Sequence, residues 1–116
     1  GGGGEDGFAY YDEGTYLSTP FDSESSTSEY YMFDIKTTIP EDTSVEIQIR
    51  ASNNPTMSGA TWCGPDGTDT TYYSSTGSYS IPPNITGRYF QYKVVFTSTS
   101  IEESALLEEL VVNYEK

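Results

Sequence analysis

Residues 87–97 alternate apolar and polar side chains along an unbroken stretch of the chain. The even positions from 90 onward are Phe90, Tyr92, Val94 and Phe96. Successive side chains of a strand point to opposite faces, so this period of two predicts a half-buried β-strand. Residues 43–51 show the same pattern, with Val45, Ile47 and Ile49 as the inward set. We expect these two strands to pack together at the centre of the fold.

The rest of the chain also favours short strands, because Tyr, Thr and Ser are frequent while Leu and Ala are few. Further strands are expected at 14–22, 29–39, 60–63, 70–73, 78–81 and from about 107 to 114. These segments, separated by turn-forming residues, predict an all-β antiparallel sandwich of seven or eight strands, similar to a jelly roll. One short helical turn is compatible with residues 102–106. The domain would cover residues 14–116, after a flexible, Gly-rich acidic segment at 1–13.

Two details of this scheme are specific enough to test. The turn-forming residues 40–42 predict that strands 29–39 and 43–51 form a hairpin. Within 29–39, the period of two places Tyr31, Phe33 and Ile35 on one face. It places Tyr30 on the opposite face.

The net charge of −13, from 18 acidic and 5 basic residues, excludes several classes of partner. Nucleic acid and anionic membrane surfaces are both disfavoured, because their recognition requires a basic patch. No apolar run approaches the 18 or so residues of a membrane-spanning helix. The charge agrees with a soluble, exported or surface-exposed domain, and divalent-cation binding is the alternative.

Enzymatic motifs are absent from the sequence. Without histidine there is no Ser-His-Asp or Cys-His arrangement, and no phosphate-binding glycine motif follows a strand. We therefore expect no enzymatic activity. Cys63 is the single cysteine, so it cannot form an intramolecular disulfide, and we expect it to be a small buried side chain.

A calcium site is the one metal hypothesis that the sequence supports. Calcium requires several oxygen ligands that converge in a loop. The candidate ligands are Asp66 and Asp69 in one loop and Asp22 and Glu24 in another. Neither loop follows the EF-hand pattern, and Asp66-Gly67 is also typical of a tight turn.

Aromatic residues in the irregular middle of the chain suggest a binding surface. These are Trp62, Tyr72, Tyr73 and Tyr79. Sugars stack on such rings while polar side chains bind the hydroxyls. A polar set, Gln48, Arg50, Gln91 and Lys93, is expected to share one outward sheet face. The alternative for any one ring is a place in the core.

Asn84 begins an Asn-Ile-Thr sequence, which matches the acceptor pattern for N-glycosylation.

Three stretches of the chain resemble one family of bacterial and archaeal surface domains. They are GTYLS and FD within 14–22, TSVEIQIRA at 43–51 with ATWCGPDGT at 60–68, and GRYFQYK at 87–93 with LVVNY at 110–114. Such domains are galactose-binding-like jelly rolls of exported proteins, some with a type IV pilin-type N-terminal segment. The resemblance implies a fold and an extracellular setting, and carries no shared catalytic residues. The apolar helix through which pilins polymerise is not among these residues, so a separate subunit would supply it, or it was removed, or the domain lies outside a pilus.

These observations predict a non-enzymatic extracellular module of a cell-surface or pilus-like filament. It would bind other protein subunits, through self-assembly or a pilin-type partner. Phe8, Tyr10 and Tyr11 would belong to a segment, 1–13, that orders on assembly. A carbohydrate-binding module is the alternative. Arg50, Arg88 and Lys93 are expected to neutralise carboxylates, within or between subunits, rather than to bind a ligand.

Overall fold

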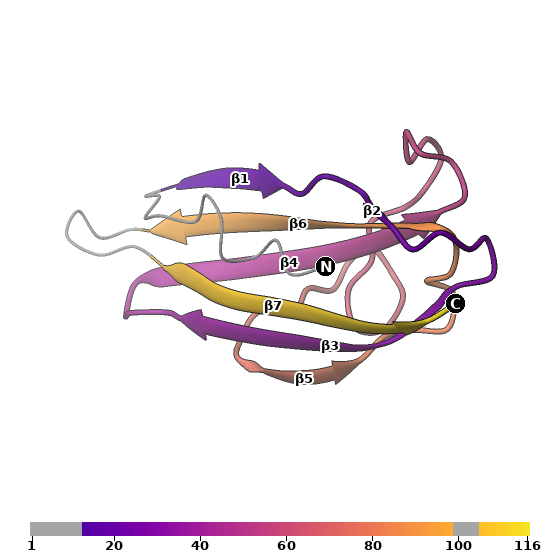
Figure 1. Cartoon of the computed structure of the whole chain (residues 1–116). Helices are drawn as coiled ribbons and strands as arrows, with labels where there is room; N and C mark the ends of the chain where they lie inside the picture. The colour runs from indigo at the N-terminus through magenta and orange to yellow at the C-terminus, as the bar shows by residue number, and fades with distance from the viewer. Residues whose placement is uncertain (1–12, 99–104) are drawn as a thin grey trace.

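The computed structural model describes residues 13–98 and 105–116, which form two antiparallel sheets packed face to face (Figure 1). The seven strands are β1 Glu13–Leu17, β2 Phe21–Asp22, β3 Glu29–Thr38, β4 Thr43–Ser52, β5 Gly77–Ser80, β6 Tyr89–Ser98 and β7 Leu106–Glu115. The predicted all-β antiparallel sandwich is confirmed, and the described residues contain no helix. The predicted segment 1–13 lies outside this description except for Glu13.

The first sheet is organised around β6. Along one side β6 pairs with β4 over its whole length, and along the other it pairs with β1 and then with β2. The single strand expected over 14–22 is therefore an edge strand in two pieces. The break contains Pro20, which has no N–H to donate to a ladder, so the edge position and the interruption agree with its chemistry.

The second sheet has the order β5-β3-β7, with β3 at its centre. The hairpin predicted for β3 and β4 is wrong, because β4 pairs with β6 in the other sheet. Residues 40–42 instead carry the chain from one sheet to the other. Thr43 donates its backbone N–H to the Pro40 carbonyl across this connection, at 3.1 Å as in an ordinary turn, and Asp42 takes a positive φ of 67°.

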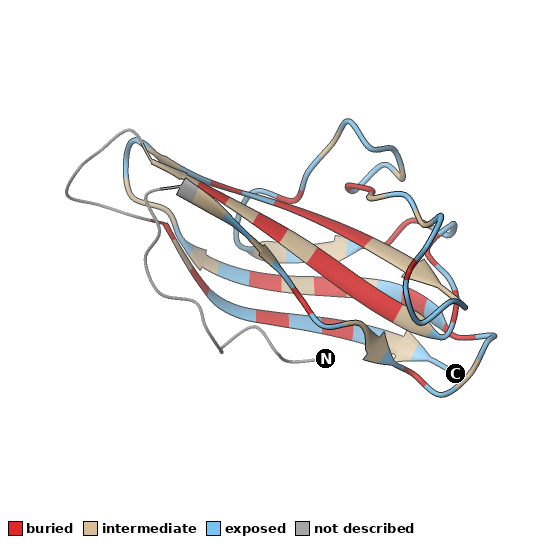
Figure 2. Cartoon of the chain, turned by 90° about the horizontal axis from the view of Figure 1, so that it is seen from above, coloured by how far each residue is buried: buried red, intermediate tan, exposed pale blue. Residues whose placement is uncertain are grey.

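The core lies between the sheets and matches the predicted inward faces. Val45, Ile47, Ile49 and Val94 each have 0% of their surface exposed. Buried bands alternate with more exposed ones along these strands (Figure 2). The facing side of the second sheet contributes Phe33, Ile35, Leu107, Leu110 and Val112. The central pairing predicted for residues 43–51 and 87–97 is thereby confirmed.

One face assignment in β3 is wrong. Tyr30 is buried at 3% exposure, whereas Tyr31 is 49% exposed. The register against β7 shifts between Tyr30 and Met32, so a bulge breaks the strict alternation at this point. Phe33 and Ile35, beyond the bulge, follow the predicted face and are buried.

The chain between β4 and β5 forms loops rather than the two short strands predicted at 60–63 and 70–73. Only single bridges occur there, from Cys63 to Ile49 and from Tyr73 to Ile47. The loop between the bridges closes tightly, because Gly64 lies directly against the Thr71 backbone and a Cβ there would overlap it. Both bridges lie along the free edge of β4 and cover it.

The last strand confirms the prediction that a strand begins near residue 107, since β7 starts at Leu106. A second register shift, between Lys36 and Thr37, places both Leu107 and Leu110 in the core. Of the predicted helical turn, residues 102–104 lie outside the described residues. Ala105 and Leu106 are not helical.

Candidate functional site

Four polar side chains share the outer face of the first sheet, as predicted. Gln48 is paired with Lys93 and Arg50 with Gln91 across β4 and β6, and paired residues of antiparallel strands point to the same face. Leu17 of β1 is paired with Lys93, so it extends this face toward the edge and is 53% exposed. We call Leu17, Gln48, Arg50, Trp62, Gln91 and Lys93 the Trp62 patch.

The indole of Trp62 lies against two cations at the centre of the patch. The Arg50 guanidinium carbon is 4.2 Å from the ring centroid, and Lys93 Nζ is 4.9 Å from it. Both distances are within the range of cation–π attraction. Trp62 comes from the loop after β4 and is only partly buried, so part of the ring is accessible.

Amide side chains fix this arrangement from below. Arg50 Nε donates to Gln91 Oε1 at 2.9 Å, and Gln91 Nε2 donates to the Ser18 carbonyl at 2.8 Å. Gln48 Nε2 donates to the carbonyls of Asp69 and Thr71, both at 3.0 Å. Gln48 and Gln91 are buried at 4% and 5% exposure, which makes them supports rather than contact residues.

The charge of the patch contrasts with its surroundings. Salt bridges between described residues join Arg88 to Asp22 and Lys116 to Glu24, and neither involves Arg50 or Lys93. The prediction that the basic residues neutralise carboxylates is thus confirmed for Arg88. Arg50 and Lys93 contact the Trp62 ring and no carboxylate of the described residues, so for these two the neutralisation of a carboxylate, within this chain or in another subunit, stays a prediction. Partial burial lowers the pKa of Arg50, whose ordinary value is far above neutrality.

The predicted tyrosines do not join the patch as a group. Tyr72 is 41% exposed, whereas Tyr73 is 1% exposed and lies in the core. The prediction that Tyr73 contacts a ligand is therefore wrong, because its ring packs edge-on against Phe33 and Tyr79 at centroid distances of 5.1 and 5.2 Å. Tyr79 is half-buried, and its hydroxyl donates to the Ser75 carbonyl at 2.8 Å. Phe8, Tyr10 and Tyr11 lie outside the described residues.

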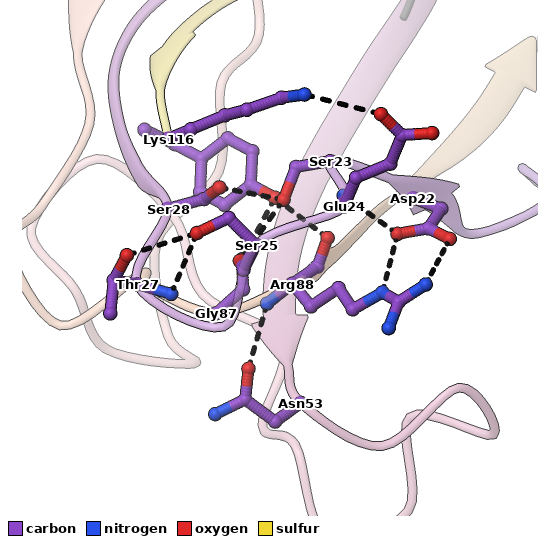
Figure 3. Close-up of polar contacts among 11 residues, drawn as sticks. Asp22, Ser23, Glu24, Ser25, Thr27, Ser28, Asn53, Gly87, Arg88 and Lys116 are labelled. Carbon is purple, nitrogen blue, oxygen red and sulfur yellow. Dashed lines mark hydrogen bonds and ion pairs between the residues drawn. The ribbon is translucent and has the colours of Figure 1, made fainter.

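Two of the candidate calcium ligands, Asp22 and Glu24, are paired with basic side chains (Figure 3). Arg88 donates from two nitrogens to the two carboxylate oxygens of Asp22, at 2.7 and 2.9 Å, and Lys116 contacts Glu24 at 3.1 Å. The bidentate Arg88 hydrogen bonds hold the pKa of Asp22 at about 2. This corner therefore joins β2, β6 and the C-terminus by ion pairs.

The other two candidate calcium ligands, Asp66 and Asp69, also do not form a metal site. Asp66 Oδ1 accepts hydrogen bonds from Thr68 N, Thr68 Oγ1 and Thr71 Oγ1. These donors lower the pKa of Asp66, and they agree with the alternative prediction that Asp66-Gly67 forms a tight turn. Asp69 is exposed, and across residues 13–98 and 105–116 no three His, Cys, Asp or Glu side chains gather into a ligand set. The calcium hypothesis has no support from this geometry.

Cys63 and Asn84 lie close together, with Asn84 Nδ2 at 3.9 Å from Cys63 Sγ. Cys63 is 3% exposed, which confirms the prediction of a buried side chain. Burial raises the pKa of its thiol and so disfavours the reactive thiolate. Asn84 is exposed and donates to the Gly67 carbonyl at 3.4 Å. Its glycosylation stays a prediction.

A cleft of about 200 Å³ opens between the two sheets where β1 and β2 separate. Phe90 and Tyr92 of β6 form one wall, and Leu110 and Val112 of β7 form the other. Its remaining lining residues are Ser18, Thr19 and Phe21. The lining is therefore mostly apolar, with the hydroxyl-bearing side chains of Ser18, Thr19 and Tyr92 and no charged group. The cleft offers apolar contact area and no acid–base pair.

No family model, curated protein or solved structure matches this chain. In the described part of the chain, no helix has the length and apolar character needed to cross a bilayer. The site must therefore be interpreted from its own chemistry.

Proposed function

We propose that this chain is a non-enzymatic extracellular module that holds protein subunits together, as the globular part of a cell-surface or pilus-like filament. The observation that supports the proposal is the Trp62 patch. It is an open surface on a sheet face, with a Trp, an Arg and an apolar Leu17 within one small area. Trp and Arg are the residues that most often dominate the energy of protein interfaces.

The shape of the molecule suits a filament subunit. Its extents are 45 × 24 × 22 Å. Glu13 pairs with Thr97 near the end of β6, whereas Lys116 contacts Glu24 beside β2, which pairs with the start of β6. The described chain therefore enters at one end of the sandwich and finishes at the other (Figure 1). The acidic composition and the family resemblance support the extracellular setting.

Self-association of the full chain tests this proposal. Sedimentation equilibrium over a range of concentrations should show oligomers, and Trp62→Ala should weaken them by at least about tenfold. Tyr72→Ala is the matched control, because it removes an exposed ring outside the patch. A wild-type chain that stays monomeric at every concentration would refute self-assembly. If both substitutions weaken the association equally, the patch has no specific role in it.

Carbohydrate binding is a second candidate, favoured by the partly exposed ring of Trp62 next to a lysine and an arginine. Ring stacking and charged donors are how proteins bind sugar faces and hydroxyls. Trp62 is the single tryptophan, so its fluorescence reports directly on a ligand at the patch. Glycans that bind in an array should shift this fluorescence in titration, and an array without ligands would eliminate the candidate.

A further inference from the structure

Self-association of this chain faces an electrostatic obstacle. Each copy carries a net charge of −13, so two copies repel one another unless cations lie at the contact. We propose that the acidic, aromatic segment preceding β1, residues 5–12, docks on the Trp62 patch of a second copy of this chain. The inference rests on the proposed function and identifies the two surfaces that meet.

The patch has binding capacity that the described structure leaves unused. Arg50 donates through Nε and Nη1 to Gln91 and to the Ala60 carbonyl, which leaves Nη2 for a partner. The Lys93 ammonium contacts the Trp62 ring and makes no hydrogen bond with the described residues. Two positive charges, part of an indole ring and the exposed Leu17 thus lie together on one face.

The proposed occupant is complementary in both charge and chemistry. Residues 5–12 read EDGFAYYD. Their carboxylates are Glu5, Asp6 and Asp12, and their rings are Phe8, Tyr10 and Tyr11. Carboxylates suit the free nitrogens of Arg50 and Lys93, and the rings suit Trp62 and Leu17.

The other basic residues of the chain offer no equivalent surface. Arg88 and Lys116 are already paired with Asp22 and Glu24. Lys36 lies on the outer side of the second sheet and faces Glu109 across the β3–β7 ladder. Arg50 and Lys93 are therefore the two cations that combine an aromatic neighbour with freedom from carboxylate partners among the described residues.

Chain length limits how much of the segment could reach the patch of its own molecule. Lys93 is paired with Leu17, four residues along β1 from Glu13, a distance of about 13 Å at about 3.3 Å per residue. Tyr10 and Tyr11 precede Glu13 by three and two residues, so their backbones reach about 10 and 7 Å from it at most. They would also have to reverse the direction of β1. Phe8, Asp6 and Glu5 precede Glu13 by five, seven and eight residues and could span about 17, 23 and 26 Å, so they alone would reach. On a second copy the two tyrosines and the carboxylates can bind the patch together.

This docking would be head-to-tail, because the segment and the patch occupy different places on the same molecule. An interface between unlike surfaces leaves one free segment and one free patch in every complex. It therefore propagates into an open chain unless the rotation closes a ring. That outcome agrees with a filament subunit.

Complementation between two full-length variants tests the docking. The segment variant carries Glu5→Gln, Asp6→Asn and Asp12→Asn, and the patch variant carries Lys93→Glu. Each variant alone should associate at least about tenfold more weakly than wild type. A mixture should form a heterodimer, because one variant retains the patch and the other retains the segment. Lys36→Glu is the control for the patch variant, with the same change of charge on an exposed lysine.

The outcomes separate the docking from the proposed function. The segment variant removes three negative charges and so reduces general repulsion, which makes a loss of its association diagnostic. If wild type associates and both variants associate equally well, the docking is wrong and the proposed function stands. If wild type is monomeric at every concentration, self-assembly is refuted, and the docking with it. If the mixed variants do not combine although wild type associates, docking between copies is refuted.

Discussion

Replacing Tyr73 by Phe is expected to stabilise this protein. Within the described residues, the Tyr73 hydroxyl is buried and has no hydrogen-bond partner. The ring itself packs well, edge-on against Phe33 and Tyr79. Phe would keep these ring contacts and remove only the unpaired hydroxyl. Tyr30→Phe is the matched control, because the Tyr30 hydroxyl donates to the Gly87 carbonyl at 2.9 Å.

The expected magnitudes follow from the cost of burying polar groups. A buried hydroxyl without a hydrogen bond costs roughly 1–3 kcal/mol in proteins. Tyr73→Phe should therefore raise the free energy of unfolding by about 1 kcal/mol or more. Tyr30→Phe loses a satisfied hydrogen bond and leaves the Gly87 carbonyl without that donor, so it should lower the free energy by about 1 kcal/mol. The two variants should differ by about 2 kcal/mol.

Alkaline pH should enlarge the advantage of Tyr73→Phe. Burial, and then the nearby Cys63, raises the pKa of Tyr73 to about 12 in the folded chain. In the unfolded chain the pKa of a tyrosine is about 10. The neutral form that the fold requires is fully available below about pH 10, and its contribution is lost as the pH rises through about 12. Wild type should therefore lose stability over this window more steeply than the variant.

Urea denaturation at pH 7 measures these differences, with Trp62 fluorescence and far-ultraviolet circular dichroism as the probes. Equal m-values across wild type and both variants are required for the comparison, because they show that the unfolding reaction is unchanged. If Tyr73→Phe destabilises the protein as much as Tyr30→Phe does, the Tyr73 hydroxyl has a partner in solution. The argument that this hydroxyl is buried without a hydrogen-bond partner would then be refuted.

Two further substitutions test the loops and the ion pair. Asp22→Asn should flatten the acid response, because the folded pKa of Asp22 is held at about 2 by Arg88 and the stability from this carboxylate is present above about pH 4 and lost as the pH falls through 2. Melting temperatures from pH 5 to 2 measure this, and parallel curves for the two proteins would contradict it. Gly64→Ala should cost about 1–3 kcal/mol, because its Cβ would overlap the Thr71 backbone. A melting temperature equal to that of wild type would show that the loop accommodates the methyl group.

The central strands could be predicted from sequence because their burial follows a simple period. Val45, Ile47 and Ile49 alternate with polar residues and are all fully buried. The same logic failed at Tyr30 and Tyr31, where a bulge moves the pattern by one residue. A bulge depends on pairing with β7, about eighty residues away in the sequence, so no local pattern reveals it.

Strand pairing was less predictable than strand position. A short turn between two amphipathic strands fits a hairpin and a crossing between sheets equally well. Residues 40–42 make the crossing because both neighbours of β3, β5 and β7, come from later in the chain. Such non-local pairing is decided by the packing of whole sheets, which the turn residues do not encode.

The Trp62 patch could likewise be predicted only in part. Its polar floor was predictable, because Gln48, Arg50, Gln91 and Lys93 occupy the outward positions of two clear strands. The position of Trp62 was not, because residues 60–63 contain no periodic pattern and form one bridge at Cys63. The ring reaches the cations because this bridge and the bridge at Tyr73 anchor the loop to the edge of β4. Weakening that anchorage should therefore separate Trp62 from Arg50 and Lys93 while the sheet remains intact, so the site depends on loop closure in a way that the fold does not.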